Sequence, residues 1–84
     1  MKHDDPLAEV MDLLINLQSD NLPRNVKIRL KNAHSALVEK NKAIPLRVDK
    51  SIEELDNISD DPNIPIYTKV KIWDLFSKLE CIQQ

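Results

Sequence analysis

Residues 64–82 read IPIYTKVKIWDLFSKLECI, and this stretch decides what kind of fold the chain can adopt. It contains every aromatic residue of the protein: Tyr67, Trp73 and Phe76. Its apolar residues recur at steps of three and four, which is the spacing of a helix and not of a strand. They form two adjacent stripes that together are wider than the ~100° apolar face of an ordinary surface helix. We therefore expect a central helix here that packs against two or three other helices.

The rest of the chain predicts three further helices. Apolar residues at helical spacing, with prolines at the starts and polar residues at the ends, place the four helices near residues 6–18, 23–40, 45–59 and 64–82. Asp5 is the expected N-cap of the first helix, and Asn41 is a candidate left-handed residue that closes the second. An apolar residue and a proline open each later helix, and the apolar residue is expected to pack back on the first turn. These pairs are Leu22-Pro23, Ile44-Pro45 and Ile64-Pro65.

The two halves of the chain resemble each other. In an alignment with a period of about 41 residues, one helical hairpin forms each unit, which is close to the size of a HEAT-type repeat. The matched apolar positions are Leu14 with Leu55, Leu17 with Ile58, Leu22 with Ile64, and Leu37 with Leu79. Chance recurrence of similar turn residues is the alternative to duplication. Because all connections are short, sequential helices should be antiparallel neighbours.

The fold class predicted for residues 1–84 is therefore all-α, as a single domain. It is a four-helix up-and-down bundle built from two similar helical hairpins. If Trp73 belongs to the core, Trp73→Ala should cost about 3–5 kcal/mol of stability. The expected core is Leu14, Leu17, Val26, Leu30, Leu37, Ile52, Leu55, Val70, Trp73, Phe76 and Leu79.

The composition excludes several classes of protein. The 84 residues include no glycine, which argues against phosphate-binding loops, dinucleotide fingerprints and nucleophile elbows. No apolar run exceeds three residues and no signal peptide is visible, so we expect no membrane association. The single cysteine, Cys81, cannot form an internal disulfide, and this fits the cytoplasm.

We expect no catalysis, no cofactor and no metal. His3 and His34 are the only histidines, and neither follows a glutamate by three residues as a di-iron bundle would require. The third position of His3 permits copper or nickel capture, which we interpret as incidental. The acidic turn at residues 59–63 lacks the spacing and the glycine of an EF-hand, so its polar residues are expected to cap helices. Nothing near Cys81 in sequence would activate its thiol.

Two short motifs resemble those of a known family. Leu22-Pro23-Arg24-Asn25 is similar to a Val-Pro-Arg-Asn motif, and Asp61-Pro62-Asn63-Ile64-Pro65 to an Asp-Pro-Asn-Met-Pro motif. With Ile72-Trp73 and Leu79-Glu80, they make the whole chain resemble the uncharacterised protein family 0147, a group of small archaeal proteins. The resemblance implies a four-helix bundle in an archaeal cytoplasm and implies no activity. The chain departs from the family between Lys40 and Asp49, where family members are richer in alanine.

Positive charge is concentrated in the middle of the chain. The net charge is −2, but residues 24–50 contain eight Lys and Arg and only two Asp and Glu. Arg24, Lys27, Lys31 and His34 fall within about 80° of arc on the second helix. Arg47 and Lys50 could extend this group. Such a stripe can contact successive phosphates, and the alternative is a solvated helix face.

The sequence leaves two functions open. We favour a protein-interaction module, with a protein partner or a second copy bound through exposed apolar residues such as Ile28, Val38 and Leu46. Ile28 lies about 200° around the second helix from Val26, so it should point away from the core. The alternative is an RNA- or ribosome-associated protein that uses the basic residues, since local field matters more than net charge.

Overall fold

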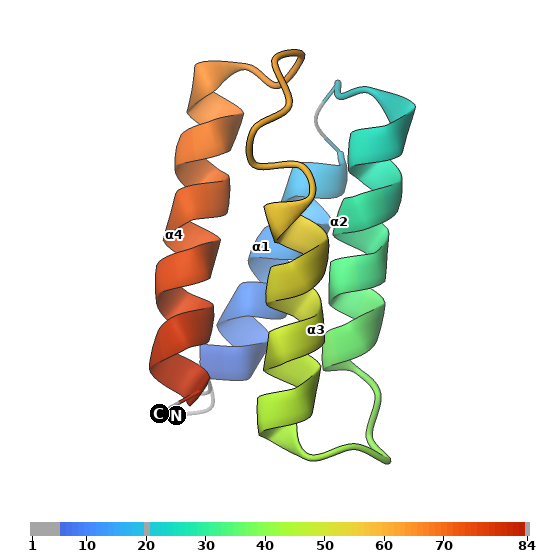
Figure 1. The fold of residues 1–84 in the computed structure, drawn as a ribbon, viewed down its shortest axis with the longest axis vertical. Helices are drawn as coiled ribbons and strands as arrows, with labels where there is room; N and C mark the ends of the chain where they lie inside the picture. The colour runs from blue at the N-terminus through green and yellow to red at the C-terminus, as the bar shows by residue number, and fades with distance from the viewer. Residues whose placement is uncertain (1–5, 20, 84) are drawn as a thin grey trace.

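Four helices make up the computed structural model of the protein, which describes residues 6–19 and 21–83, with only the backbone of Gln83. They are α1 (Pro6–Gln18), α2 (Arg24–Leu37), α3 (Ile44–Asp56) and α4 (Ile66–Gln83), and the described residues include no strand. Figure 1 shows the helices side by side and alternating in direction. Each helix contacts the next, and α4 also contacts α1, which closes the bundle. The predicted all-α four-helix bundle is confirmed.

The helix ends differ from the prediction by a few residues. α2 ends at Leu37 and not near Lys40, and α3 ends at Asp56 and not at residue 59. The left-handed turn at Asn41 is wrong, because no described residue has a positive φ. Asp5 lies outside the described residues.

A side chain from α3 holds the loop that follows α2. Arg47 donates through Nε to the carbonyl oxygen of Lys42 at 2.8 Å and through Nη2 to that of Lys40 at 3.1 Å. These two carbonyls therefore have partners without a further helical turn. Arg47 thus fixes the connection between α2 and α3.

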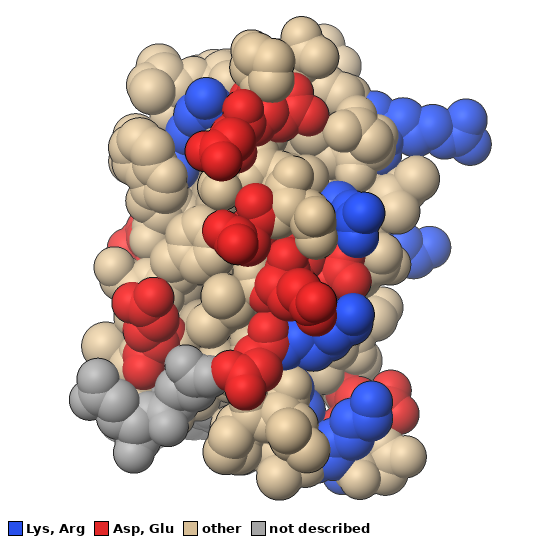
Figure 2. Space-filling view, in the orientation of Figure 1, with Lys and Arg blue, Asp and Glu red and all other residues tan. Residues whose placement is uncertain are grey.

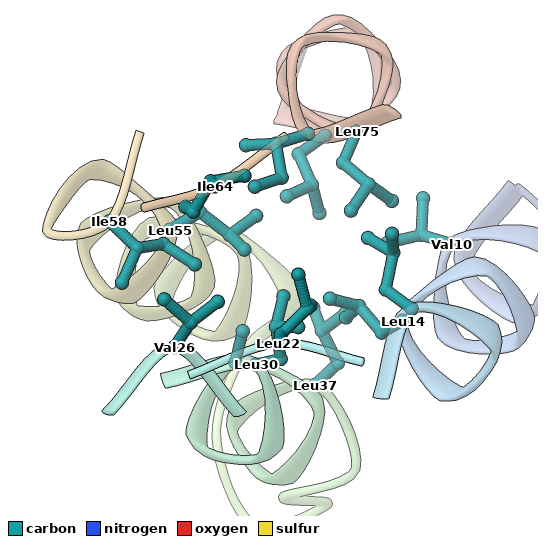
Figure 3. Close-up of a cluster of buried hydrophobic side chains, with 14 of the residues drawn as sticks. Val10, Leu14, Leu22, Val26, Leu30, Leu37, Leu55, Ile58, Ile64 and Leu75 are labelled. Atoms are coloured by element: carbon teal, nitrogen blue, oxygen red, sulfur yellow. The ribbon is translucent and has the colours of Figure 1, made fainter. Parts of the chain in front are cut away.

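The core consists of the inward faces of the four helices, and Figure 3 labels ten of its residues. Seven predicted core residues are buried, while Ile52 and Phe76 are half-buried and pack against the core. Val70 and Trp73 are exposed, so their prediction as core residues is wrong. In their place, α4 buries Ile72 and Leu75 beside the predicted Leu79. The confirmed seven are Leu14, Leu17, Val26, Leu30, Leu37, Leu55 and Leu79.

The two motifs behind the family resemblance meet at one end of the bundle. The segment between α3 and α4 folds over this end (Figure 1). Leu22 and Ile64 are buried there, as predicted for residues that pack back on a helix start. Asn25 donates through Nδ2 to Oδ2 of Asp61 at 3.2 Å, and Oδ1 of Asp61 accepts from the backbone N–H of Asn63 at 2.8 Å. The motifs therefore hold the fold together.

The matched positions of the two hairpins have the same environment. All eight apolar residues aligned between the two halves of the chain are buried. The third proline motif departs from this pattern, because Ile44, at the start of α3, is exposed. The packing prediction for the residue before proline is thus confirmed twice and wrong once.

Candidate functional site

The outer surface of α4 carries three large apolar side chains that the bundle does not cover. Ile66, Val70 and Trp73 are 68%, 53% and 51% exposed. At 100° per residue they lie within about 60° of arc, and their centre is about 150° around the helix from that of Ile72, Leu75 and Leu79. We call this group of three the α4 outer face. It lies almost opposite the core.

Charged residues border the α4 outer face on both sides. On the side of α1, Lys78 contacts Asp74 at 3.7 Å and Glu9 of α1 at 3.6 Å. On the other side, the ammonium group of Lys69 makes no ion pair with any described residue. Tyr67, also exposed, lies at the Asp74 edge, where Lys71 Nζ is 5.8 Å from its ring centre. The face is therefore an apolar strip between charges of opposite sign.

A small cavity adjoins this strip between α1 and α4. Its volume is about 260 Å³, and its lining includes Leu13, Leu17 and Asn16 from α1, with Lys71 and Asp74 from α4. Leu17 belongs to the core, and the other lining residues lie toward the surface. The cavity therefore adds apolar surface to the Asp74 edge of the strip.

The basic stripe predicted on the second helix lies on the surface of α2. Arg24, Lys27 and Lys31 are exposed, and none of them makes an ion pair with a described residue, while His34 is half-buried. We call these four residues the α2 basic face. Figure 2 shows Lys and Arg side chains along the edge of the molecule formed by α2, and Asp and Glu side chains down the middle over α3.

Arg47 and Lys50 do not extend the α2 basic face. Both lie on α3, against the side of α2 that carries Arg29 and Asn32. This side is about 140–160° around α2 from Lys27 and His34. Arg47 donates to the two loop carbonyls, and Lys50 Nζ lies 3.4 Å from carboxylate oxygens of both Glu53 and Glu54. The six basic residues therefore form two separate groups, and the second group is occupied by internal contacts.

A buried carboxylate organises the contact between α2 and α3. Glu54 is only 6% exposed, and its Oε1 lies 2.9 Å from Nη1 of Arg29. The hydrogen bond from Arg29 lowers the pKa of Glu54, burial opposes this, and hydrogen bonds from Lys50 and Asn32 lower the pKa further. The same cluster raises the pKa of Lys50 through its hydrogen bonds with Glu53 and Glu54. These contacts join α2 to α3, and Arg29 and Lys50 are both engaged with carboxylates of α3.

The lowered pKa of Glu54 predicts a defined dependence of stability on pH. Because the pKa is lower in the folded chain, ionised Glu54 stabilises the fold above its ordinary pKa of 4.5 and loses this effect as pH falls through the folded value. Glu54→Gln removes the titration. Denaturant unfolding should therefore show the largest difference between wild type and Glu54→Gln near about pH 7, narrowing toward about pH 3. A difference that stays constant over this range would contradict the assignment.

A groove also lies between α2 and α3. Its volume is about 530 Å³, and its lining includes Ala36, Leu46, Arg47, Lys50 and Glu54. Leu46, Val38 and Ile28 are 59%, 46% and 50% exposed, which confirms that all three lie on the surface. Only Leu46 lines the groove, and Ile28 lies between polar residues on α2. Ile28 therefore stands alone among polar residues, unlike the members of the α4 outer face.

The part of the chain that the structure describes contains no candidate metal site. No group of three or more His, Cys, Asp or Glu side chains that could hold a metal ion lies among these described residues. His3 lies outside the described part of the chain, and Cys81 is exposed. Of the turn at residues 59–63, Ser59 Oγ donates to the carbonyl oxygen of Asp56 at the end of α3 at 3.2 Å, as expected for a cap. Both oxygens of Asp61 accept hydrogen bonds, from the side chain of Asn25 and the backbone N–H of Asn63, and neither of these bonds caps a helix. No described helix is long and apolar enough to cross a membrane.

The fold and these surfaces define a small helical bundle with an apolar strip, a basic face and a groove. Its sequence places it in a family: the model of the uncharacterised protein family UPF0147 matches residues 1–82, and the chain belongs to this family. A UPF0147 protein of Methanocaldococcus jannaschii is 32% identical over 77 residues, which cover 92% of this chain and 81% of that protein. A second, from Methanosarcina mazei, is 34% identical over 77 residues, covering 90% and 83% of the two chains.

A solved structure shares the fold. The crystal structure of the unknown-function protein MMP1188 matches with a TM-score of 0.90 and 35% sequence identity, over 96% of this chain and 93% of that one. The archaeal family predicted from the motifs is thereby confirmed. The names of these relatives record no activity, so the function has to be argued from the surface of the molecule.

Proposed function

We propose that this protein is a non-enzymatic protein-interaction module and that the α4 outer face is its main binding surface. The observation that carries the proposal is the exposure of Ile66, Val70 and Trp73 on one face of one helix. Single exposed apolar residues are ordinary, but adjoining large ones mark binding sites. Tryptophan is also among the residues that contribute most to binding energy at interfaces.

The position of the α4 outer face supports this proposal. It lies almost opposite the core, on the side of α4 that points away from α1 and α3, so a partner can reach it without any change of the bundle. Ile28 and Val38, the residues favoured from the sequence, become secondary contacts in this proposal because polar residues separate them. The proposal places the protein in the cytoplasm, since an exposed single thiol such as Cys81 suits a reducing compartment.

An RNA or ribosome partner is the second candidate, and the α2 basic face supports it. Arg24, Lys27 and Lys31 are exposed and make no ion pair within the described part of the chain, so their charges are free to contact phosphates. We place this candidate second because Arg29, Arg47 and Lys50 are engaged in internal contacts. Few basic residues then remain to hold a nucleic acid.

Pull-down from native lysate separates the two candidates. The wild-type chain should capture a protein partner that survives both nuclease treatment and high salt, because apolar contacts do not depend on counterion release. Phosphate contacts weaken with a log–log slope of roughly 0.7–0.9 per contact as salt rises. Val70→Asp should abolish the capture by placing a charge in the middle of the strip.

Two further baits make the result specific. Ile28→Asp introduces the same charge at another half-exposed apolar position and should leave the capture unchanged. Lys27→Glu with Lys31→Glu reverses the charge of the α2 basic face and should also leave it unchanged. Capture that disappears with nuclease and with this double substitution, but persists in Val70→Asp, would overturn the proposal in favour of RNA.

A further inference from the structure

We propose that the partner of the α4 outer face is a second copy of this chain, with the two α4 helices parallel and related by a two-fold axis. This inference rests on the proposed function, because it names the occupant of the same surface. It depends on the spacing of the apolar residues and on the charges beside them.

The apolar residues have the spacing of a coiled-coil seam. Ile66, Val70, Trp73 and Ser77 follow one another at steps of four, three and four, and all four are exposed. This alternation keeps one side of a helix facing an identical helix beside it. Because α4 contacts only α1 and α3, its outer side forms a corner of the bundle, and a second α4 can approach to the usual ~8–10 Å between helix axes.

The bordering charges select a second copy in the parallel orientation. Lys69 and Asp74 lie about 70° to either side of the seam. In a parallel pair, the residue just before an apolar seam position of one helix lies beside the residue five places further along the other helix. Lys69 of each copy therefore lies beside Asp74 of the other copy. In an antiparallel pair, the edge that carries Lys69 would instead lie against the same edge of the other copy, and the edge that carries Asp74 would lie against its counterpart, so like charges would meet.

Both members of this pair are available for the contact. Lys69 makes no ion pair with any described residue. Asp74 uses Oδ2 for its contact with Lys78, and its side chain is still 56% exposed. The two-fold axis doubles the pair, as in any isologous interface. Glu80 would next face its own copy across the seam, which confines the contact to the stretch from Ile66 to Ser77.

Sedimentation equilibrium of the full chain tests the inference. The wild type should dimerise reversibly, with a mass approaching twice 9.7 kDa as concentration rises. Val70→Asp should remain a monomer, while the matched control Ile28→Asp should dimerise as the wild type does. Circular dichroism spectra identical to the wild type would show that each variant is folded.

A charge exchange tests the orientation. Lys69→Asp and Asp74→Lys should each raise the dimer dissociation constant roughly tenfold or more, because two attractive pairs become two repulsive ones. An equimolar mixture of the two variants should restore dimerisation to within about threefold of the wild type, since the mixed dimer regains both opposite-charge pairs. Failure of the mixture to restore it, with both variants folded, would overturn the parallel arrangement.

The outcomes also separate this inference from the proposed function. A wild-type chain that stays monomeric, but loses a captured protein on Val70→Asp, would overturn the second copy and leave the interaction module standing. A monomeric chain whose captured partners do not depend on Val70 would overturn both.

Discussion

Leu75→Ala should destabilise the bundle by about 2–5 kcal/mol, whereas Trp73→Ala should change the free energy of unfolding by about 1 kcal/mol or less. Leu75 is fully buried on the inner side of α4, so its truncation leaves a cavity that the neighbouring helices cannot fill. Trp73 is half exposed, so truncating its side chain removes much surface that was in contact with solvent and not with the core. For a small domain the first change removes a large part of the total stability.

Denaturant unfolding of both variants in a Val70→Asp background measures the difference without any contribution from self-association. Leu79→Ala, another fully buried position of α4, should behave like Leu75→Ala. A loss of stability in Trp73→Ala that equals or exceeds the loss in Leu75→Ala would show that the orientation of α4 is wrong.

Arg29→Ala should destabilise the fold by about 1–3 kcal/mol, the second largest effect that we expect. The change removes the strongest partner of Glu54 and leaves a carboxylate that is only 6% exposed. Lys50 and Asn32 still lower the pKa of Glu54, which keeps the loss below that of a fully unpaired buried charge. Thermal unfolding at neutral pH measures the effect.

Arg24→Ala is the matched control for this substitution. Arg24 lies on the same helix, is exposed and makes no ion pair with a described residue, so its removal should leave stability nearly unchanged. Equal losses in the two variants would show that the charge of α2, and not the contact with Glu54, stabilises the fold.

The helices and their order were predictable because their signals are local. Apolar spacing and the proline motifs place each helix to within a few residues of its bounds. The end of α2 was not predictable, because the group that satisfies the loop carbonyls is Arg47, which comes from the next helix. The contact between Asn25 and Asp61 likewise joins segments 36 residues apart.

The orientation of α4 shows where the sequence prediction failed. Both of its stripes are apolar near the start of the helix, and the aromatic Trp73 favoured the wrong one. The signal that separates them lies further along: the stripe of Trp73 continues into Ser77 and Glu80, whereas that of Leu75 continues into Leu79 and Ile82. Only the second can bury apolar side chains along the whole helix. Thr68, a polar residue that is fully buried, weakened this signal.

The candidate site followed from the sequence only in part. Exposure of Ile28, Val38 and the α2 basic face was predicted, because each lies away from a clear core stripe on α2. The α4 outer face was missed as a consequence of the wrong orientation of α4. The separation of Arg47 and Lys50 from the α2 basic face depends on how α3 packs against α2, which no local pattern encodes.

Quenching of the fluorescence of Trp73 by acrylamide tests the central claim most directly, because it is the single tryptophan of the protein. We predict that in dilute solution, and in Val70→Asp at any concentration, the folded chain is quenched nearly as efficiently as the denatured chain. As the wild-type concentration rises and the α4 outer face becomes covered, the quenching should decrease. Strong protection of Trp73 in the folded monomer of Val70→Asp would contradict the account, because it would place this side chain in the core and remove the binding surface.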